Sequence, residues 1–212
     1  MRIYIIIFLL TGLIANAQSS FTQEVAAITQ KYDSLYDASR ESIVFTGSSS
    51  IRVWNDLQER FPDHQVINSG FGGSQAVDLL QFTNDLILNY QPKKVFIYEG
   101  DNDIQSKKRP KEIISTISQI RDLIFENNPQ TEIVFISAKP SISRWKLRRK
   151  YKRLNRKMEK MTLTDGRLKY VDVWKPMLEG RKVKQDIFVS DGLHMNSKGY
   201  EIWYTELKNH VN

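Results

Sequence analysis

Four short polar segments carry side chains that are capable of nucleophilic or acid–base chemistry. The first is Gly47–Ser50, which follows an apolar run. A glycine before small polar residues forms a tight turn that can expose a side chain, so Ser49 could act as a nucleophile. Taken alone, such a serine cluster is more typical of a helix N-cap.

The second and third segments could supply hydrogen-bond donors to a reacting oxygen. Asn68–Ser74 contains three glycines, which permit positive φ and a close approach of the backbone to a ligand. It lacks the G-x-G-x-x-G spacing of a dinucleotide site, and a flexible loop with Ser74 as an N-cap is an equal alternative. Glu99–Asp103 contains Asn102, whose amide could donate to an oxyanion or simply occupy a turn. Its acidic residues are too few for an EF-hand loop.

The fourth segment pairs an imidazole with a carboxylate. Asp191 and His194 are three residues apart, a spacing that allows Asp191 to hold the ring for general-base work. Half of a metal site is the competing interpretation, but no second His or Cys follows at ligand spacing. The chain has no cysteine, which also excludes a thiolate nucleophile.

Alternating strand and helix patterns surround these segments. Apolar runs predict strands at Ile43–Thr46, Gln65–Asn68, Lys94–Glu99, Glu132–Ser137 and Leu168–Val173. Helical spacing predicts helices at Phe21–Tyr36, from Ser74 to about Asn89, after Pro110, through Leu147–Met161 and through Tyr200–Val211. The alternation predicts an α/β sandwich, in which ligands bind beyond the carboxyl ends of the strands. Each polar segment except the last directly follows a predicted strand.

The order of these segments resembles that of the SGNH (GDSL-like) hydrolases. The similarity covers roughly residues 42–211 and rests on Phe45–Ser50, Asn68–Gly73, Gly100–Asp103 and Asp191–His194. The resemblance implies a flavodoxin-like three-layer α/β/α fold with a parallel five-stranded sheet in the order 2-1-3-4-5. It also implies ester hydrolysis through an acyl-enzyme, without a metal or organic cofactor.

The resemblance also assigns roles to individual residues. Ser49 would be the nucleophile, His194 the base and Asp191 its orienting acid. The oxyanion would be met by the backbone N–H groups of Ser49 and Gly73 and by the Asn102 side chain. Ser48 stands where the family has Asp, which keeps Ser48 and Ser50 open as alternative nucleophiles.

The first residues have the pattern of a secretory signal. Arg2 precedes an apolar run from Ile3 to Ile14, and Ala15–Ala17 offers a small-x-small cleavage site. The run is too short for a membrane span, which needs roughly 20 apolar residues. We therefore expect a signal peptide at residues 1–17, a single domain at residues 18–212, and an exported protein that is periplasmic or secreted without stable membrane insertion.

The basic charge is concentrated in one segment. Arg144–Lys160 contains ten Lys or Arg and one Glu, a local balance of +9 against +7 for the whole chain. The expected explanation is a helix whose apolar stripe faces the sheet and whose cations fill the solvated face. Weak contact with a polyanion is the alternative, and a non-catalytic polyanion-binding protein on a hydrolase scaffold is a second functional hypothesis. Nucleic acid is not expected, because few aromatic residues are interleaved for base stacking.

The expected export and the resemblance to the SGNH hydrolases favour short acyl groups, acetyl above all, on a small-molecule or glycan ester as the substrate. Lysophospholipase or thioesterase activity is the enzymatic alternative.

Overall fold

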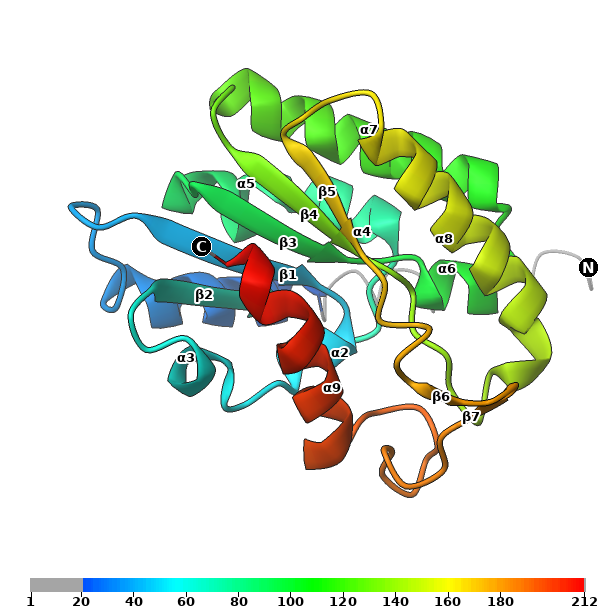
Figure 1. Cartoon of the computed structure of the whole chain (residues 1–212). Coiled ribbons are helices and arrows are strands. Elements are labelled where there is room, and N and C mark those ends of the chain that lie inside the picture. The colour runs from blue at the N-terminus through cyan, green and yellow to red at the C-terminus, as the bar shows by residue number, and fades with distance from the viewer. Residues whose placement is uncertain (1–20, 212) are drawn as a thin grey trace, which may run out of the picture.

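A five-stranded parallel sheet forms the centre of the protein in the computed structural model, which describes residues 21–211 (Figure 1). Its strands are β1 (Ser42–Gly47), β2 (Gln65–Gly70), β3 (Lys94–Tyr98), β4 (Glu132–Ile136) and β5 (Leu168–Val171). The strands lie in the order β2-β1-β3-β4-β5, and every neighbouring pair is parallel. The predicted strands and their order are thus confirmed to within two residues at each end.

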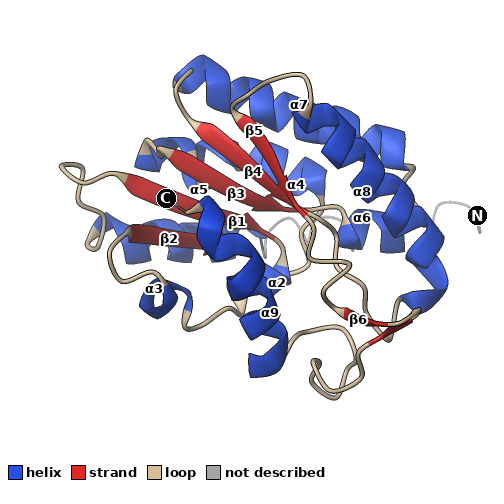
Figure 2. Ribbon diagram, in the orientation of Figure 1, coloured by secondary structure: helices blue, strands red, loops and turns tan. Residues whose placement is uncertain are grey.

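Helices cover both faces of the sheet (Figure 2). One layer contains α4 (Ala76–Gln81), α5 (Thr83–Leu86), α6 (Asp101–Gln105), α7 (Pro110–Asn127), α8 (Arg148–Thr162) and the N-terminal helix at residues 21–33. The other contains α2 (Ser49–Arg52), α3 (Leu57–Arg60) and α9 (Ser197–Leu207). Short 3-10 turns occur at Leu88–Tyr90, Trp145–Leu147 and Lys208–His210. A small hairpin, β6 (Leu178–Glu179) with β7 (Lys182–Val183), was not anticipated from the sequence.

The strands are apolar throughout because both of their faces are buried. Neighbouring side chains enter different cores: Val44 packs in the layer of α7 and α8, whereas Phe45 packs in the layer of α2 and α9. Both side chains are fully buried, as expected for a central strand covered on both sides. The predicted three-layer α/β/α fold is confirmed.

The apolar stripes of the two long helices face the sheet as predicted. On α7, Pro110 occupies the first turn, and the stripe of four isoleucines (Ile113, Ile117, Ile120 and Ile124) is buried. On α8, Tyr151, Leu154 and Met158 are buried, but the helix begins at Arg148 and Leu147 belongs to the preceding 3-10 turn.

The predicted continuous helix from Ser74 to about Asn89 is wrong. The segment is broken into α4, α5 and a 3-10 turn, with breaks at Phe82 and Ile87. The Thr83 hydroxyl donates to the carbonyl of Leu79 at 2.8 Å, a back-bond that bends helices. Ser74 is not the N-cap either, since Gln75 occupies that position.

The N-terminal helix ends at residue 33 rather than at Tyr36, and it packs against the sheet layer through buried Val25 and Tyr32. The predicted signal peptide at residues 1–17 and the first residues of the predicted domain at residues 18–212 lie outside the described residues. Between residues 21 and 211, no helix combines the length and apolarity that crossing a membrane requires.

Candidate active site

A tight turn after β1 presents Ser49 above the carboxyl edge of the sheet. Gly47 has φ of +124°, and a Cβ atom there would lie 2.0 Å from the carbonyl oxygen of Tyr98. The turn is tied to both neighbouring strand ends, because Ser48 N–H donates to the Tyr98 carbonyl and Phe71 N–H donates to the Gly47 carbonyl. Only glycine can make this turn, so the Gly47 conformation sets the direction in which Ser49 points.

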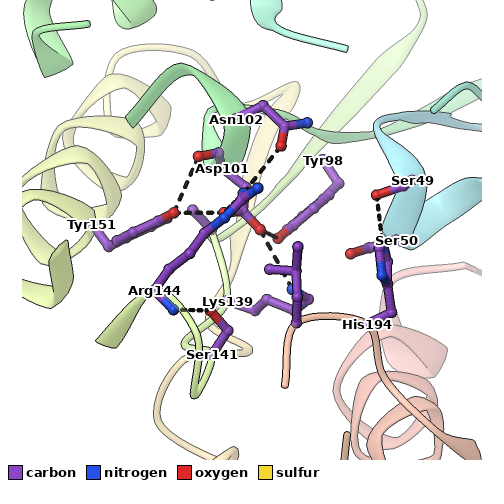
Figure 3. A network of polar contacts seen from close by, with 12 residues as sticks. Ser49, Ser50, Tyr98, Asp101, Asn102, Lys139, Ser141, Arg144, Tyr151 and His194 are labelled. Carbon is purple, nitrogen blue, oxygen red and sulfur yellow. Dashed lines mark hydrogen bonds and ion pairs between the residues drawn. The ribbon is translucent and has the colours of Figure 1, made fainter. Parts of the chain in front are cut away.

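Ser49, His194 and Asp191 form a continuous chain of hydrogen bonds. The Ser49 Oγ lies 2.9 Å from His194 Nε2, and His194 Nδ1 lies 2.6 Å from Asp191 Oδ2 (Figure 3 for the first pair). With Nδ1–H donating to the carboxylate, Nε2 carries the lone pair that can accept the serine proton. Ser49 lies 145 residues before His194 in the chain, and the fold brings it to the Asp191–His194 pair.

The Asp191 carboxylate is held in its ionised form by several donors. Its burial is slight and would raise its pKa, but hydrogen bonds outweigh that effect and lower the pKa to about 2. The donors are the backbone N–H of Leu193 at 2.7 Å, the backbone N–H of His194 at 2.9 Å and the imidazole itself. At neutral pH the carboxylate is therefore charged and able to stabilise a protonated His194.

The loop that carries Asp191 and His194 is braced on both sides. Gly192 has φ of +63°, and its carbonyl accepts a hydrogen bond from the N–H of Ser143. Immediately after the histidine, the Asn196 side chain caps α9 by accepting from the N–H groups of Lys198 and Gly199. The loop is thus fixed between the segment after β4 and the start of the last helix.

The three donors that the family resemblance assigns to an oxyanion each have a hydrogen without a protein acceptor in the described part of the chain. Gly73 has φ of +76°, and a Cβ atom there would meet no atom within 4 Å, so this backbone faces open space. In the described part of the chain, neither the Ser49 N–H nor the Gly73 N–H donates to a protein acceptor. The Asn102 Nδ2 donates one hydrogen to the Ser74 carbonyl at 2.8 Å, and its second hydrogen has no acceptor among residues 21–211.

Sequence reasoning missed the group that orients Asn102. Arg144 Nη1 donates to the Asn102 Oδ1 at 3.0 Å and to the Asp101 Oδ1 at 2.6 Å (Figure 3). With its oxygen bound to Arg144, the Asn102 amide must direct its NH₂ group toward Ser74. Arg144 was expected on the solvated face of a basic helix, which is wrong: it precedes that helix, and its side chain is 15% exposed.

Asp101 anchors Arg144 in a buried polar network. Its carboxylate accepts hydrogen bonds from the hydroxyls of Tyr98 at 3.0 Å and Tyr151 at 2.6 Å, and Lys139 Nζ lies 3.4 Å away. Burial alone would raise the pKa of Asp101, but the charges of Lys139 and Arg144 lower it to about 2. The carboxylate is therefore ionised, and the network is a paired charge cluster under the site.

The N-terminal helix supports the glycine loop, a second contact that sequence reasoning missed. Both carboxylate oxygens of Glu24 accept from the Gly72 N–H at 3.1 Å, and Arg52 pairs with the same carboxylate at 3.2 Å. Glu24 thereby fixes the residue before Gly73. No short motif surrounds Glu24, so its role has no signal in the sequence.

The remaining polar candidates, Ser48, Ser50 and Glu99, are buried. The alternative nucleophiles Ser48 and Ser50 are each 3% exposed, and Ser49 is the serine of the three whose hydroxyl contacts His194. Glu99 is buried, and its Oε1 accepts from the Ser74 hydroxyl at 2.7 Å. Burial followed by the charge of Asp103 raises the pKa of Glu99 well above its usual value.

Two further interpretations concern Trp54 and metal binding. Trp54, as expected, packs between helix and sheet, stacked on Tyr200 and edge-on to Phe45. Within residues 21–211, no group of three or more His, Asp or Glu side chains is arranged to hold a metal ion.

Comparisons with known proteins agree with this architecture. Residues 27–202 match the model of the GDSL-like Lipase/Acylhydrolase family. A search of curated proteins found no match. Among solved structures, a protein from Streptococcus pneumonia, provisionally described as a platelet activating factor, is 22% identical with a TM-score of 0.80 over 94% of this chain and 98% of its own.

Two other solved structures share the fold. A GDSL-like lipase from Bacteroides thetaiotaomicron is 19% identical with a TM-score of 0.72, over 86% of this chain and 96% of its own. A carbohydrate esterase family 3 protein from Talaromyces cellulolyticus is 15% identical with a TM-score of 0.64, over 81% of this chain and 96% of its own. At these identities the likeness concerns the fold.

Proposed function

Because this chain belongs to the GDSL-like lipase/acylhydrolase family, we propose that it hydrolyses carboxylic esters through an acyl-enzyme on Ser49, with short acyl groups on carbohydrate as its substrates. The observation that carries the proposal is the hydrogen-bonded chain from Ser49 through His194 to Asp191, with contacts of 2.9 and 2.6 Å. These distances lie within the range at which a general base abstracts a proton.

The reaction proceeds in two half-reactions. His194 Nε2 takes the proton of Ser49 as Oγ attacks the ester carbonyl carbon, and the imidazolium that forms is stabilised by the Asp191 carboxylate. His194 then gives this proton to the departing alcohol oxygen, which leaves an acyl group on Ser49. Water attacks the acyl-enzyme with His194 again as base, and the acid is released with Ser49 restored.

The negative charge on the substrate oxygen is met by the donors described above. The N–H groups of Ser49 and Gly73 and the free hydrogen of Asn102 Nδ2 remain without protein acceptors in the described chain, so a substrate oxygen would satisfy all three. Donors fixed before the reaction stabilise the transition state without reorganisation. Loss of one such donor typically lowers turnover by about 10²–10³.

Short acyl groups are supported by the side chains next to the histidine loop. Ile142 lies against Gly192, and Val189 lies two residues before Asp191; they are 38% and 45% exposed. Two separate apolar side chains of this size offer a small contact surface, which suits an acetyl group better than a long acyl chain. A carbohydrate esterase among the proteins of the same fold points to the same substrate class.

The expected signal peptide supports a glycan substrate. We propose that residues 1–17 direct export and are removed after Ala17, which would place the enzyme where acylated polysaccharides occur. N-terminal sequencing of the protein recovered outside the cytoplasm tests this, and a sequence that begins at Met1 would contradict it.

Hydrolysis of p-nitrophenyl esters tests the proposed activity. We expect the wild type to hydrolyse the acetate and butyrate, to lose rate on longer chains, and to release acetate from acetylated xylo-oligosaccharides. The Ser49→Ala variant is expected at background, whereas Ser50→Ala, a change at the neighbouring buried serine, should keep activity. Activity that survives in Ser49→Ala would refute the nucleophile, and a preference for long chains would favour a lysophospholipase or thioesterase.

A further inference from the structure

A cavity of about 520 Å³ opens between α8 and the segment that follows β5. This volume falls within the roughly 300–1,000 Å³ of sites that hold small organic ligands. None of Ser49, His194 and Asp191 lines it. The cavity is therefore distinct from the candidate active site, and a ligand bound there need not be the ester substrate.

Five cations line the cavity without neutralising partners. They are Arg149, Lys152, Arg153, Arg156 and Lys175. In the described part of the chain, none of the five forms an ion pair with a carboxylate, whereas Arg144, in the preceding turn, is paired with Asp101. These five cations outnumber the two carboxylates of the lining, Glu159 and Asp172, so an anion bound there would lower the repulsion that remains between the cations.

The cations on α8 form a single row. Arg149, Lys152, Arg153 and Arg156 recur at i, i+3, i+4 and i+7, which places them on one helical face. The row extends about 10 Å along the axis at a rise of about 1.5 Å per residue. Lys175 lies on the opposite wall, after β5. A ligand that meets both walls and the length of the row must carry more than one anionic group.

The other lining groups indicate that this anion also carries hydroxyls. Glu159 and Asp172 stand among the cations, and the Asp172 Oδ2 accepts no hydrogen bond within the described chain. These carboxylates would repel a bare phosphate chain but would accept hydrogen bonds from sugar hydroxyls. Tyr170 and Trp174 also line the cavity, and Lys152 Nζ lies 5.9 Å from the centre of the Trp174 ring.

The lining of the cavity matches neither a membrane surface nor a nucleic acid. Binding to a bilayer needs apolar side chains that insert between headgroups, and none of the large exposed apolar residues of the described chain lines the cavity. Single-stranded nucleic acid is held by stacking on exposed rings, whereas Trp174 is only 6% exposed.

We propose that this cavity binds an anionic oligosaccharide, with sulfate or carboxylate groups contacting the α8 cations and sugar hydroxyls contacting Glu159 and Asp172.

Calorimetric titration of the purified protein with a heparin hexasaccharide tests the proposal. The titration is run at about 0.15 M NaCl, where charges more than about 8 Å apart are screened. The test variant is Arg153→Ala/Arg156→Ala, two exposed cations of the cavity. The matched control is Lys150→Ala/Lys157→Ala, two exposed cations of the same helix outside the cavity. Both variants lose the same charge, and none of the four side chains has an ion pair within the described chain, so both should fold.

We expect the test variant to bind the hexasaccharide at least about tenfold more weakly, which corresponds to ~1.4 kcal/mol for two lost ion pairs. The control should stay within about twofold of the wild type, as is usual for exposed charges without a partner. Equal weakening in both variants would show that only the net charge of α8 matters and would overturn the proposal.

Competitors identify the ligand class. A neutral maltohexaose should not bind. A DNA duplex of the same charge, or a vesicle containing phosphatidylserine, that binds as tightly as the hexasaccharide would also overturn the proposal. Repeating the titration with the Ser49→Ala variant should give an unchanged affinity, since the cavity contains no part of the candidate active site. A lost affinity in that variant would mean that the sugar binds at Ser49 instead.

Discussion

Replacement of Arg144 by methionine should lower turnover although Arg144 is assigned no contact with the ester. The guanidinium donates to the Asn102 Oδ1 and thereby keeps the Asn102 NH₂ directed toward Ser74 and the proposed oxyanion. Methionine keeps a similar length and removes the donor. In the variant, a flipped amide that turns its oxygen toward the developing negative charge is no longer excluded by Arg144.

The size of the effect follows from the bonds that remain. The hydrogen bond from a charged donor contributes about 1.5–3 kcal/mol, whereas the surviving bond to the Ser74 carbonyl is neutral and contributes about 1 kcal/mol. The amide keeps part of its orientation, so kcat should fall by about 10- to 100-fold, less than the 10²–10³ expected for Asn102→Ala. KM should change little, because the oxyanion forms in the transition state.

A double-mutant cycle separates positioning from structural damage. In an Asn102→Ala background, Arg144→Met should have little further effect on kcat, since the group through which it acts is absent. Arg148→Met is the control, because Arg148 contacts Trp145 and neither Asn102 nor Asp101. Thermal unfolding reports the separate cost of leaving Asp101 with one cation fewer. A wild-type kcat in folded Arg144→Met, or an equally large effect of this substitution without Asn102, would refute the positioning role of Arg144.

Three other substitutions have defined outcomes. Asp191→Asn should lower kcat by up to about 10⁴ by favouring the wrong His194 tautomer, as measured with p-nitrophenyl acetate; a loss under about tenfold would contradict the role of Asp191. Gly47→Ala should yield little folded protein because its Cβ would meet the Tyr98 carbonyl, whereas Gly166→Ala, with no atom within 4 Å, should fold normally; equal yields of the two would contradict this. Glu99 has a pKa raised well above 4.5, so the wild type loses stability as pH rises past that value. Glu99→Gln does not titrate, so it should raise Tm at pH 8 and by less at pH 5; a larger gain at pH 5 than at pH 8 would contradict the raised pKa of Glu99.

The strands and long helices could be predicted because burial leaves a direct pattern of apolar residues. A strand buried on both faces is apolar throughout, and a helix buried on one face has an apolar stripe. Continuous apolar runs marked the five strands, and the isoleucine stripe marked α7. The segment from Ser74 to Asn89 does not follow this pattern. Its apolar residues have helical spacing, but the breaks at Phe82 and Ile87 depend on local backbone geometry and on the Thr83 back-bond. Periodicity does not report such bonds.

The residues proposed for the site could be selected from the sequence, whereas the groups that support them could not. Ser49, Gly73, Asn102, Asp191 and His194 follow recognisable residues at fixed places in the chain, and the fold brings them to one edge of the sheet. The role of Arg144 could not be predicted, because the nine further cations that follow it in the segment favoured a solvated basic face. Its contact with Asp101 joins positions 43 residues apart, and no local pattern records such a pairing.

The last helix is joined to the first turn of the site, and this affects when the protein becomes active. Ser49 and His194 are separated by 145 residues, and the Tyr200 hydroxyl donates to the Ser50 carbonyl across 150 residues. Contacts this distant in sequence form late, because a long loop must close before they provide any stabilisation. During synthesis, the sheet and the oxyanion donors can be in place while the base is still absent. In refolding, recovery of esterase activity should therefore lag behind recovery of the far-ultraviolet circular dichroism, and the lag measures the docking of α9.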